Sequence, residues 1–262
     1  HVAKIVESLG TNAYDALVAA LDHDGPAIRA AAVRHLGLIG DDRALDPLRA
    51  RIGVEQSFNA LYELPLAIAN LSRPETVDAL MSMLALRDDG SYVAGSGQAR
   101  AEAIDQLAYK LSSQPDRVGD AIPVLLERLG DDNGYVVVRA QAALVSLGSA
   151  VVPRALALAD GGWQTVRLSV IPTVDVDREK ARRIAVFGHA VNALVALREP
   201  TVMSDDQRRE ALRIFDEALT DDDLRGHSST GLRGMGGHSV PLLVAQLDSD
   251  DVRTRVTAAQ AL

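Results

Sequence analysis

Apolar residues recur along this chain with the spacing of amphipathic helices. Between Ala13 and Leu21 they return every three or four positions, and a polar turn follows. A second run with the same spacing begins after Pro26, a residue that suits the first turn of a helix. We expect Gly37 and Gly40 to end this second helix. The pattern therefore predicts two antiparallel helices joined by a tight polar turn.

The same pattern continues through the rest of the chain and predicts seven further helix pairs. These pairs span residues 43–70, 74–112, 118–147, 150–173, 177–197, 205–233 and 238–262. Two stretches are less regular. Residues 87–98 are rich in glycine and are expected to form an extended loop, and residues 174–200 are expected to form one long helix or two short ones. No segment shows the alternation of a β-strand, so the predicted fold class is all-α.

The two ends of the sequence resemble incomplete helix pairs. Residues 1–10 resemble a second helix without its first, and residues 252–262 stop inside a second helix without a polar cap. The end repeats of a stacked array normally carry a polar outer face. We therefore expect the chain to be a segment of a longer array, or its ends to be covered by another structure.

A short phrase recurs within these helix pairs. The first helix carries a proline, the turn is rich in aspartate, and the second helix starts with an apolar residue followed by arginine. The apolar-arginine steps are Ile28-Arg29, Val138-Arg139, Val166-Arg167, Leu224-Arg225 and Val252-Arg253. Pro123 and Pro153 are 30 residues apart, and Arg225 and Arg253 are 28 apart. A phrase that returns at this period is typical of a protein built from stacked repeats.

These phrases resemble the HEAT repeat, and within that family the short variety first noted in phycobilisome lyases. The matching residues are Val151-Val152-Pro153, Asp160 and Val166-Arg167 in one unit, and Ser239-Val240-Pro241, Asp248 and Val252-Arg253 in another. The resemblance covers most of the chain and is weak at 54–70 and 174–200. It implies a right-handed α-solenoid in which residues 1–262 form a single array of about eight helix pairs. In this family the second helices line the concave face, where partners usually bind.

The repeated arginines and aspartates are expected to hold neighbouring repeats in register. An aspartate at a helix start accepts backbone N–H bonds and complements the helix dipole. An arginine one turn into the helix can pair with that aspartate or with its neighbour in the adjacent repeat. We predict that this structural ladder comprises Arg29, Arg139, Arg167, Arg225 and Arg253, with Asp24, Asp160 and Asp248.

Charge and composition restrict the partners. The chain has 36 acidic and 27 basic residues and a net charge of -9, which argues against a general nucleic-acid or anionic-membrane binder, because both need a positive field. Aromatic residues make up 3% of the chain, so the core must consist of small aliphatic side chains. Cysteine is absent, which excludes disulfides and thiolate metal sites. No run approaches about 20 apolar residues, so we expect a cytoplasmic protein without a membrane span.

Three features that suggest chemistry have simpler structural explanations. Asp22-His23-Asp24 carries metal-ligand side chains, but adjacent residues of one turn rarely converge on one ion. Ser228-Ser229-Thr230 follows His227, yet neighbours in sequence do not make a catalytic triad. The glycines of residues 231–237 precede His238 without the strand-to-helix context of a phosphate-binding loop, and are expected at a helix end. We therefore predict no catalytic, cofactor-binding or metal-binding residue.

The leading hypothesis is a non-catalytic scaffold that binds another protein on the concave face of the solenoid. A first alternative is a chromophore chaperone or enzyme like the bilin lyases, which needs aromatic and charged side chains along the groove. The low aromatic content argues against it. A second alternative is a HEAT-like DNA glycosylase, which needs a basic channel. Another protein is thus the expected partner, with no cofactor, nucleic acid or membrane, and the oligomeric state is not indicated.

Overall fold

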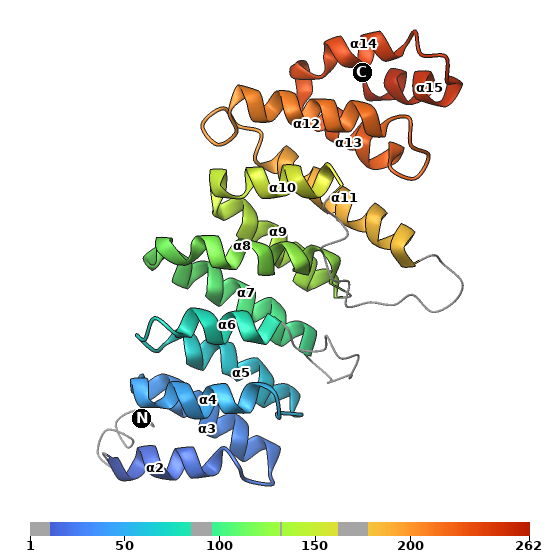
Figure 1. The fold of residues 1–262 in the computed structure, drawn as a ribbon. Coiled ribbons are helices and arrows are strands. Elements are labelled where there is room, and N and C mark those ends of the chain that lie inside the picture. The colour runs from blue at the N-terminus through green and yellow to red at the C-terminus, as the bar shows by residue number, and fades with distance from the viewer. Residues whose placement is uncertain (1–10, 85–95, 132, 162–177) are drawn as a thin grey trace. The chain divides into compact units, whose positions relative to one another are not determined.

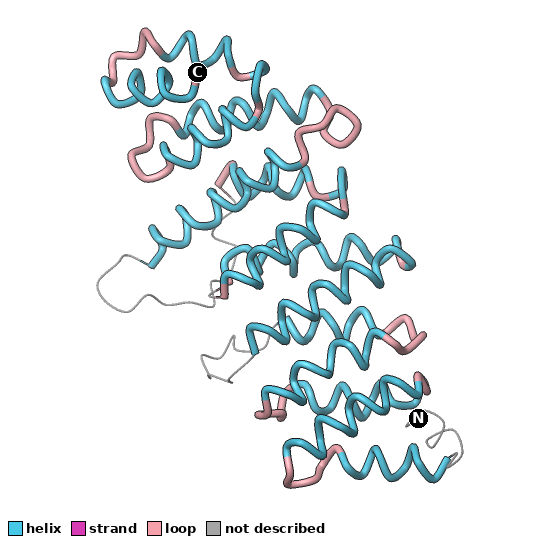
Figure 2. Tube along the Cα trace, turned by 180° about the vertical axis from the view of Figure 1, so that it is seen from behind, coloured by secondary structure: helices cyan, strands magenta, loops and turns pink. Residues whose placement is uncertain are grey.

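The structure is a computed structural model, and it describes residues 11–84, 96–131, 133–161 and 178–262. These ranges contain 14 α-helices and no strand (Figures 1 and 2). The helices are α2 (Thr11–Ala20), α3 (Pro26–Ile39), α4 (Leu45–Ile52), α5 (Phe58–Ala69), α6 (Thr76–Leu84), α7 (Ser96–Ser113), α8 (Val118–Glu127), α9 (Gly134–Ser146), α10 (Val152–Ala159), α11 (Arg178–Ala196), α12 (Asp205–Ala218), α13 (Arg225–Gly234), α14 (Val240–Gln246) and α15 (Val252–Ala261). The predicted all-α solenoid of helix pairs is confirmed.

Consecutive helices pack as pairs, and the second helices of successive pairs pack on one another. The pairs in contact are α2 with α3, α4 with α5, α6 with α7, α10 with α11, α12 with α13, and α14 with α15. The second-helix contacts are α3 with α5, α5 with α7, α11 with α13, and α13 with α15. Each of these second helices therefore packs on its own partner and on the second helix of a neighbouring repeat, which is how a stacked array forms a continuous core.

The described residues divide into two compact units. Unit 1 comprises His1–Val124 and Asn133–Ala143, and unit 2 comprises Leu125–Asp132 and Leu144–Leu262, in each case within the described ranges. In unit 1, α2, α4 and α6 form one layer, and α3, α5 and α7 form a second layer behind it (Figure 1). The core between these layers consists mainly of Ala, Leu, Val and Ile side chains, as the composition requires.

The first helix pair shows how local sequence sets the helix ends. Pro26 occupies the first turn of α3, and Gly40 ends it in the left-handed conformation at φ 67°. Gly37 does not end the helix, contrary to the sequence prediction, and lies inside it. A Cβ atom at this position would sit against the Cα of Ala67 and 2.7 Å from its Cβ. The missing side chain therefore lets α3 and α5 approach closely.

The two irregular stretches differ in part from their predictions. Residues 85–95 of the expected loop 87–98 lie outside the described residues, whereas residues 96–98 form the first turn of α7. Gly97 is used there for close packing, because an added Cβ would lie 2.8 Å from the Cγ of Asn133. Within 174–200, the described part is one long helix, α11, which packs on α10. The expected pair 177–197 is therefore a single helix.

A buried ion cluster connects the first two repeats of unit 1. The side chain of Glu55 is 1% exposed and accepts hydrogen bonds from two arginines. Arg29 donates to both carboxylate oxygens at 2.9 and 2.8 Å, and Arg51 donates from Nη2 at 2.9 Å. The backbone N–H groups of Gln56 and Ser57 donate to Glu55 Oε1 at 3.0 and 2.8 Å. One carboxylate thus joins α3, α4 and the turn before α5.

This cluster makes the free energy of unfolding of unit 1 depend on pH. Burial would raise the pKa of Glu55, but its hydrogen bonds from Arg29, Ser57 and Arg51 lower it from 4.5 to about 2. A depressed pKa stabilises the fold fully above the unfolded value, and the contribution is lost as pH falls through the folded value. We expect the stability difference between the wild type and Glu55→Gln to be constant above pH 5 and to shrink between about pH 4.5 and 2. Urea unfolding across this range measures it, and a difference independent of pH would contradict the assignment.

Candidate binding surface

Exposed aromatic side chains gather on the second helices of unit 1. Among the described residues, four aromatic side chains count as exposed, namely Phe58, Tyr62, Tyr109 and Tyr135. Phe58 and Tyr62 lie on α5, Tyr109 on α7 and Tyr135 on α9. The rings of Phe58 and Tyr62, one helical turn apart, stack with centroids 6.3 Å apart and planes inclined by 16°. Tyr135 is 72% exposed, which is high for tyrosine, a residue of intermediate burial in folded proteins.

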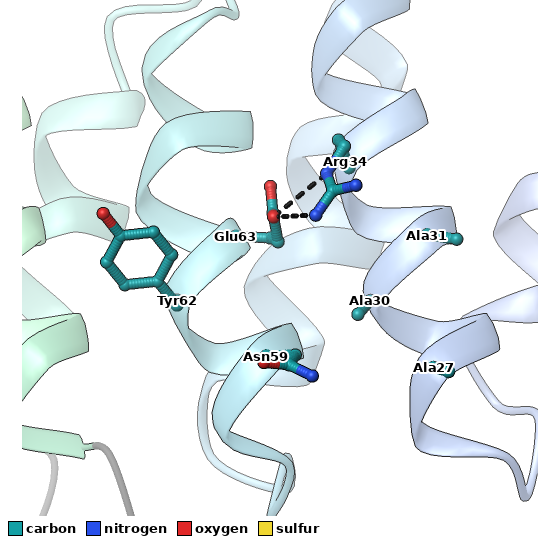
Figure 3. Close-up of a pocket in the computed structure, with 7 residues that line it drawn as sticks. All are labelled: Ala27, Ala30, Ala31, Arg34, Asn59, Tyr62 and Glu63. Atoms are coloured by element: carbon teal, nitrogen blue, oxygen red, sulfur yellow. Dashed lines mark hydrogen bonds and ion pairs between the residues drawn. The ribbon is translucent and has the colours of Figure 1, made fainter. Parts of the chain in front are cut away.

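A first hollow of about 280 Å³ lies between α3 and α5 (Figure 3). Its α3 side consists of Ala27, Ala30 and Ala31 with Arg34, and its α5 side of Asn59, Tyr62 and Glu63. The small alanines leave the space, because no long side chain projects from that turn of α3. Arg34 donates from Nε to Glu63 Oε1 at 3.0 Å and makes a second, shorter bond from Nη2. The ring of Tyr62 turns away from α3 (Figure 3).

A second hollow of about 330 Å³ adjoins the first at Tyr62. It is lined from three second helices: Tyr62 of α5, Gln98, Ala101, Glu102 and Asp105 of α7, and Tyr135 and Arg139 of α9. Tyr62 lines both hollows, and we call the two hollows together the second-helix groove. Every residue that lines it comes from a second helix of unit 1.

Carboxylates dominate the electrostatics of the second hollow. Arg139 Nη1 lies 3.3 Å from Asp105 Oδ2, and Gln106 Nε2 donates to Glu102 Oε1 at 2.9 Å. The Tyr62 hydroxyl lies 3.5 Å from Glu102 Oε2, and the charge of Glu102 is the main cause that raises the pKa of Tyr62. Burial is the main cause that raises the pKa of Asp105, while Arg139 opposes it and Glu102 adds to it. Among the described residues, Glu102 forms no ion pair with an arginine or lysine.

The predicted ladder residues lie at the junctions between repeats, in differing arrangements. Arg29 binds Glu55, and its Nη1 donates to the backbone oxygens of His23 and Asp24 at 2.9 and 3.0 Å. Arg225 binds Asp222 at 2.6 Å and Asp251 at 3.2 Å. Both arginines thus reach an acid 26 positions later, in the next repeat. The sequence analysis did not include Glu55 or Asp251 in the ladder.

The remaining ladder residues have other neighbours. Arg253 donates to Asp222 at 3.1 Å, Asp160 accepts from Arg213 at 2.8 Å, and Arg139 belongs to the second-helix groove. The side chain of Asp248 is exposed, and Asp251 caps α15 in its place. Arg167 lies outside the described residues, so the ladder as a set stays a prediction.

The other chemically suggestive residues do not converge. In the 22–24 turn, His23 Nδ1 accepts the N–H of Gly25 at 2.8 Å, while Asp22 pairs with Arg51 at 3.1 Å. The buried hydroxyl of Ser228 donates to the carbonyl of Phe215 and therefore has a structural partner. Across the described ranges, no group of three or more His, Asp or Glu side chains could hold a metal ion.

Two further findings concern the glycines and the membrane prediction. Gly231 lies inside α13 and packs closely against Phe215, contrary to the expected helix end, whereas Gly234 is the last residue of α13, as expected, and packs against Val195. In the described part of the chain, no single helix is long and apolar enough to cross a membrane, and one bent pair, Gly134–Ser146 with Gly148–Ala159, reaches that threshold by length and composition only.

Comparison with known proteins gives one family match and similar structures among those already solved. A family model of HEAT repeats matches residues 1–60. No curated protein matches the chain. Among solved structures, that of human deoxyhypusine hydroxylase in complex with glycerol is similar, with 17% sequence identity and a TM-score of 0.36, covering 99% of this chain and 86% of that chain.

These comparisons confirm one prediction and correct another. The resemblance to HEAT repeats is confirmed, whereas nothing found supports the narrower phycobilisome-lyase variety. The prediction that the chain is not an enzyme is contradicted, because the similar solved structure is that of a hydroxylase. A TM-score of 0.36 transfers no reaction to this chain, so the correction withdraws the non-catalytic assignment and puts no activity in its place.

Proposed function

We propose that this chain, whose residues 1–60 match a family model of HEAT repeats, binds another protein on the second helices of unit 1. The observation that carries the proposal is the placement of the exposed aromatic side chains. All four found among the described residues lie on α5, α7 and α9. Tyrosine and phenylalanine are enriched at protein interfaces, because they bury a large area with few rotatable bonds.

The shape and extent of the surface favour a protein over a small molecule. The two hollows, of about 280 and 330 Å³, lie at the lower end of the range for small-molecule sites. Exposed side chains extend beyond them along the same helices, including Tyr109 on α7 and Val138 on α9, which are 69% and 63% exposed. A surface with shallow hollows and scattered aromatic anchors suits a protein interface, in which a few buried residues supply most of the binding energy.

Site-specific photo-crosslinking in the organism of origin tests this proposal. A photoreactive phenylalanine analogue placed at Tyr62, Tyr109 or Tyr135 is expected to give adducts with one and the same protein. The control carries the analogue at Asp15, an exposed position on the first helix α2. Adducts from α2 that equal those from the three tyrosine positions would refute a binding surface on the second helices.

A second candidate function is chromophore handling, and one observation favours it. A groove of the bilin-lyase kind needs aromatic and charged side chains together, and the second-helix groove brings Tyr62 and Tyr135 beside Glu102 and Arg139. Incubation with a bilin tests it by absorbance. A shifted visible band that is lost in a Tyr62→Leu, Tyr135→Leu variant would support chromophore binding at this groove, and an unchanged spectrum would reject it.

A further inference from the structure

We propose that the second hollow of the groove receives an arginine side chain from the partner protein. This inference rests on the proposed function and adds the chemistry that the partner presents. It follows from three features of the hollow: two exposed tyrosine rings, a carboxylate that pairs with no arginine or lysine in the described part of the chain, and arginines that are already paired.

The tyrosines provide the apolar and π-electron part of the site. Tyr62 and Tyr135 line the same hollow from α5 and α9, and both side chains are exposed, at 38% and 72%. A cation above a tyrosine ring is attracted by the negative face of its π system. A long side chain with a charged end can therefore lay its aliphatic part on one ring and bring its charge to the carboxylates of α7.

The balance of charge in the groove selects a cation. The ion pairs Arg34–Glu63 and Arg139–Asp105 each combine one positive and one negative charge. Glu102 remains, and its contacts are the amide of Gln106 and the hydroxyl of Tyr62, neither of which is charged. The groove thus carries one excess negative charge. An acidic side chain would have to displace a carboxylate from an existing ion pair, whereas a single cation would neutralise the excess negative charge of the groove.

The geometry of the donors favours arginine over lysine. A guanidinium is planar and offers several N–H groups, so it can stack on a tyrosine ring and donate to a carboxylate at the same time. Its pairing with a carboxylate is often bidentate, which strengthens the contact. The lysine ammonium is a compact and strongly hydrated charge without a face to stack. The two tyrosines would therefore add more to the binding of arginine than of lysine.

Fluorescence anisotropy with labelled peptides tests the inference. The probe is an acetylated and amidated peptide with three arginines, each separated by two glycines, and the comparison peptides carry lysine, glutamine or glutamate at the same positions. The arginine peptide is expected to bind about two- to fivefold more tightly than the lysine peptide, since one exposed cation–π contact contributes roughly 0.5–1 kcal/mol. Glutamine and glutamate peptides are expected to bind more weakly than either. Added salt should weaken the binding of the arginine peptide.

Variants localise the binding to the hollow. Glu102→Gln removes one charge and keeps the size of the side chain, and Tyr62→Leu with Tyr135→Leu removes the rings but keeps apolar contact. Tyr62→Leu with Tyr135→Leu is expected to weaken binding of the arginine peptide about two- to fivefold, the value of one exposed cation–π contact, and Glu102→Gln by up to about fivefold, the value of one exposed ion pair. Asp15→Asn is the matched control, because it removes one exposed carboxylate from α2 and leaves the groove unchanged.

The outcomes separate this inference from the proposed function. Equal binding of the arginine and glutamine peptides, or an equal loss in Asp15→Asn and Glu102→Gln, would overturn the arginine site. Lysine binding as tight as arginine binding would overturn the role of the tyrosines as a stacking surface. In each of these cases, crosslinks from Tyr62 and Tyr135 to one protein would still support the interaction surface. Loss of those crosslinks overturns the proposed function itself.

Discussion

Glu55→Gln is expected to lower the free energy of unfolding of unit 1 by about 3 kcal/mol, the cost of removing one partner of a buried ion pair. The Glu55 carboxylate is 1% exposed and is shared by Arg29, Arg51 and two backbone N–H groups. Glutamine has the same size, but it offers one acceptor oxygen and no charge. The Arg29 guanidinium, 15% exposed, would then keep its positive charge near the interior without a carboxylate partner, and Arg51 would keep only the exposed carboxylate of Asp22. Urea unfolding followed by circular dichroism measures the loss.

The matched control for this variant is Glu75→Gln. Glu75 pairs with Arg73 in the same unit, but the two side chains are 49% and 32% exposed. Solvent screens such a pair, so the unfolding midpoint should hardly change. If both variants shifted the midpoint equally, burial would not be the reason that Glu55 matters, and the proposed junction between the first two repeats would be wrong.

Gly37→Ala is expected to destabilise unit 1 by about 1–3 kcal/mol, the usual cost of overpacking a core. Alanine is the better helix former by about 1 kcal/mol, so helix propensity alone predicts that this substitution stabilises unit 1. The structure decides between them: the added Cβ would lie 2.7 Å from the Cβ of Ala67 and against its backbone. Because the atoms it meets are near the main chain, α3 and α5 must move apart.

Gly119→Ala is the control for this second variant. Gly119 also lies in a helix of unit 1, and no atom lies within 4 Å of a Cβ at that position. Alanine is therefore expected to leave stability unchanged or to raise it by up to about 1 kcal/mol. The two substitutions are chemically identical, so opposite effects in denaturant unfolding would identify close helix packing as the cause. Stabilisation by both would contradict the tight α3–α5 contact.

Helix periodicity and turn chemistry were sufficient to predict the fold. Pro26 and Gly40 mark the start and end of α3 as expected, because these residues act through their own backbone geometry. Gly37 was misassigned for the opposite reason. Its role depends on Ala67 in the next repeat, and local sequence does not contain that neighbour. Gly231 was misassigned in the same way.

The sequence predicted that arginine–acid pairs join neighbouring repeats, but it did not identify which acids take part. Arginine at the start of a second helix does bind an acid of the next repeat, at Arg29 and Arg225. The acids themselves, Glu55 and Asp251, were not identified, since Glu55 lies where the repeat phrase is weakest and Asp248 had the expected position in the turn. A search for acids 26 positions after each arginine would have found both.

The resemblance to HEAT repeats pointed to the second helices as the binding face, but the residues of the candidate surface were not predicted, although a signal for them was present. Composition counts aromatic residues but does not tell which of them face solvent. Tyr62, Tyr109 and Tyr135 each lie in a helix on the side away from its apolar stripe, and only the assembled second helices bring these sides together. Helical-wheel placement of each tyrosine against its own apolar stripe would have indicated their exposure.

The most direct test of the binding surface is the affinity of the crosslinked partner for three forms of the chain. The Tyr62→Leu, Tyr135→Leu variant should bind that partner at least tenfold more weakly than the wild type, because truncation of an interface hot spot costs about 2 kcal/mol or more. The Asp15→Asn variant should bind it as the wild type does. Equal affinities for all three forms, with the fold intact by circular dichroism, would contradict the claim that the second helices of unit 1 are where this protein binds.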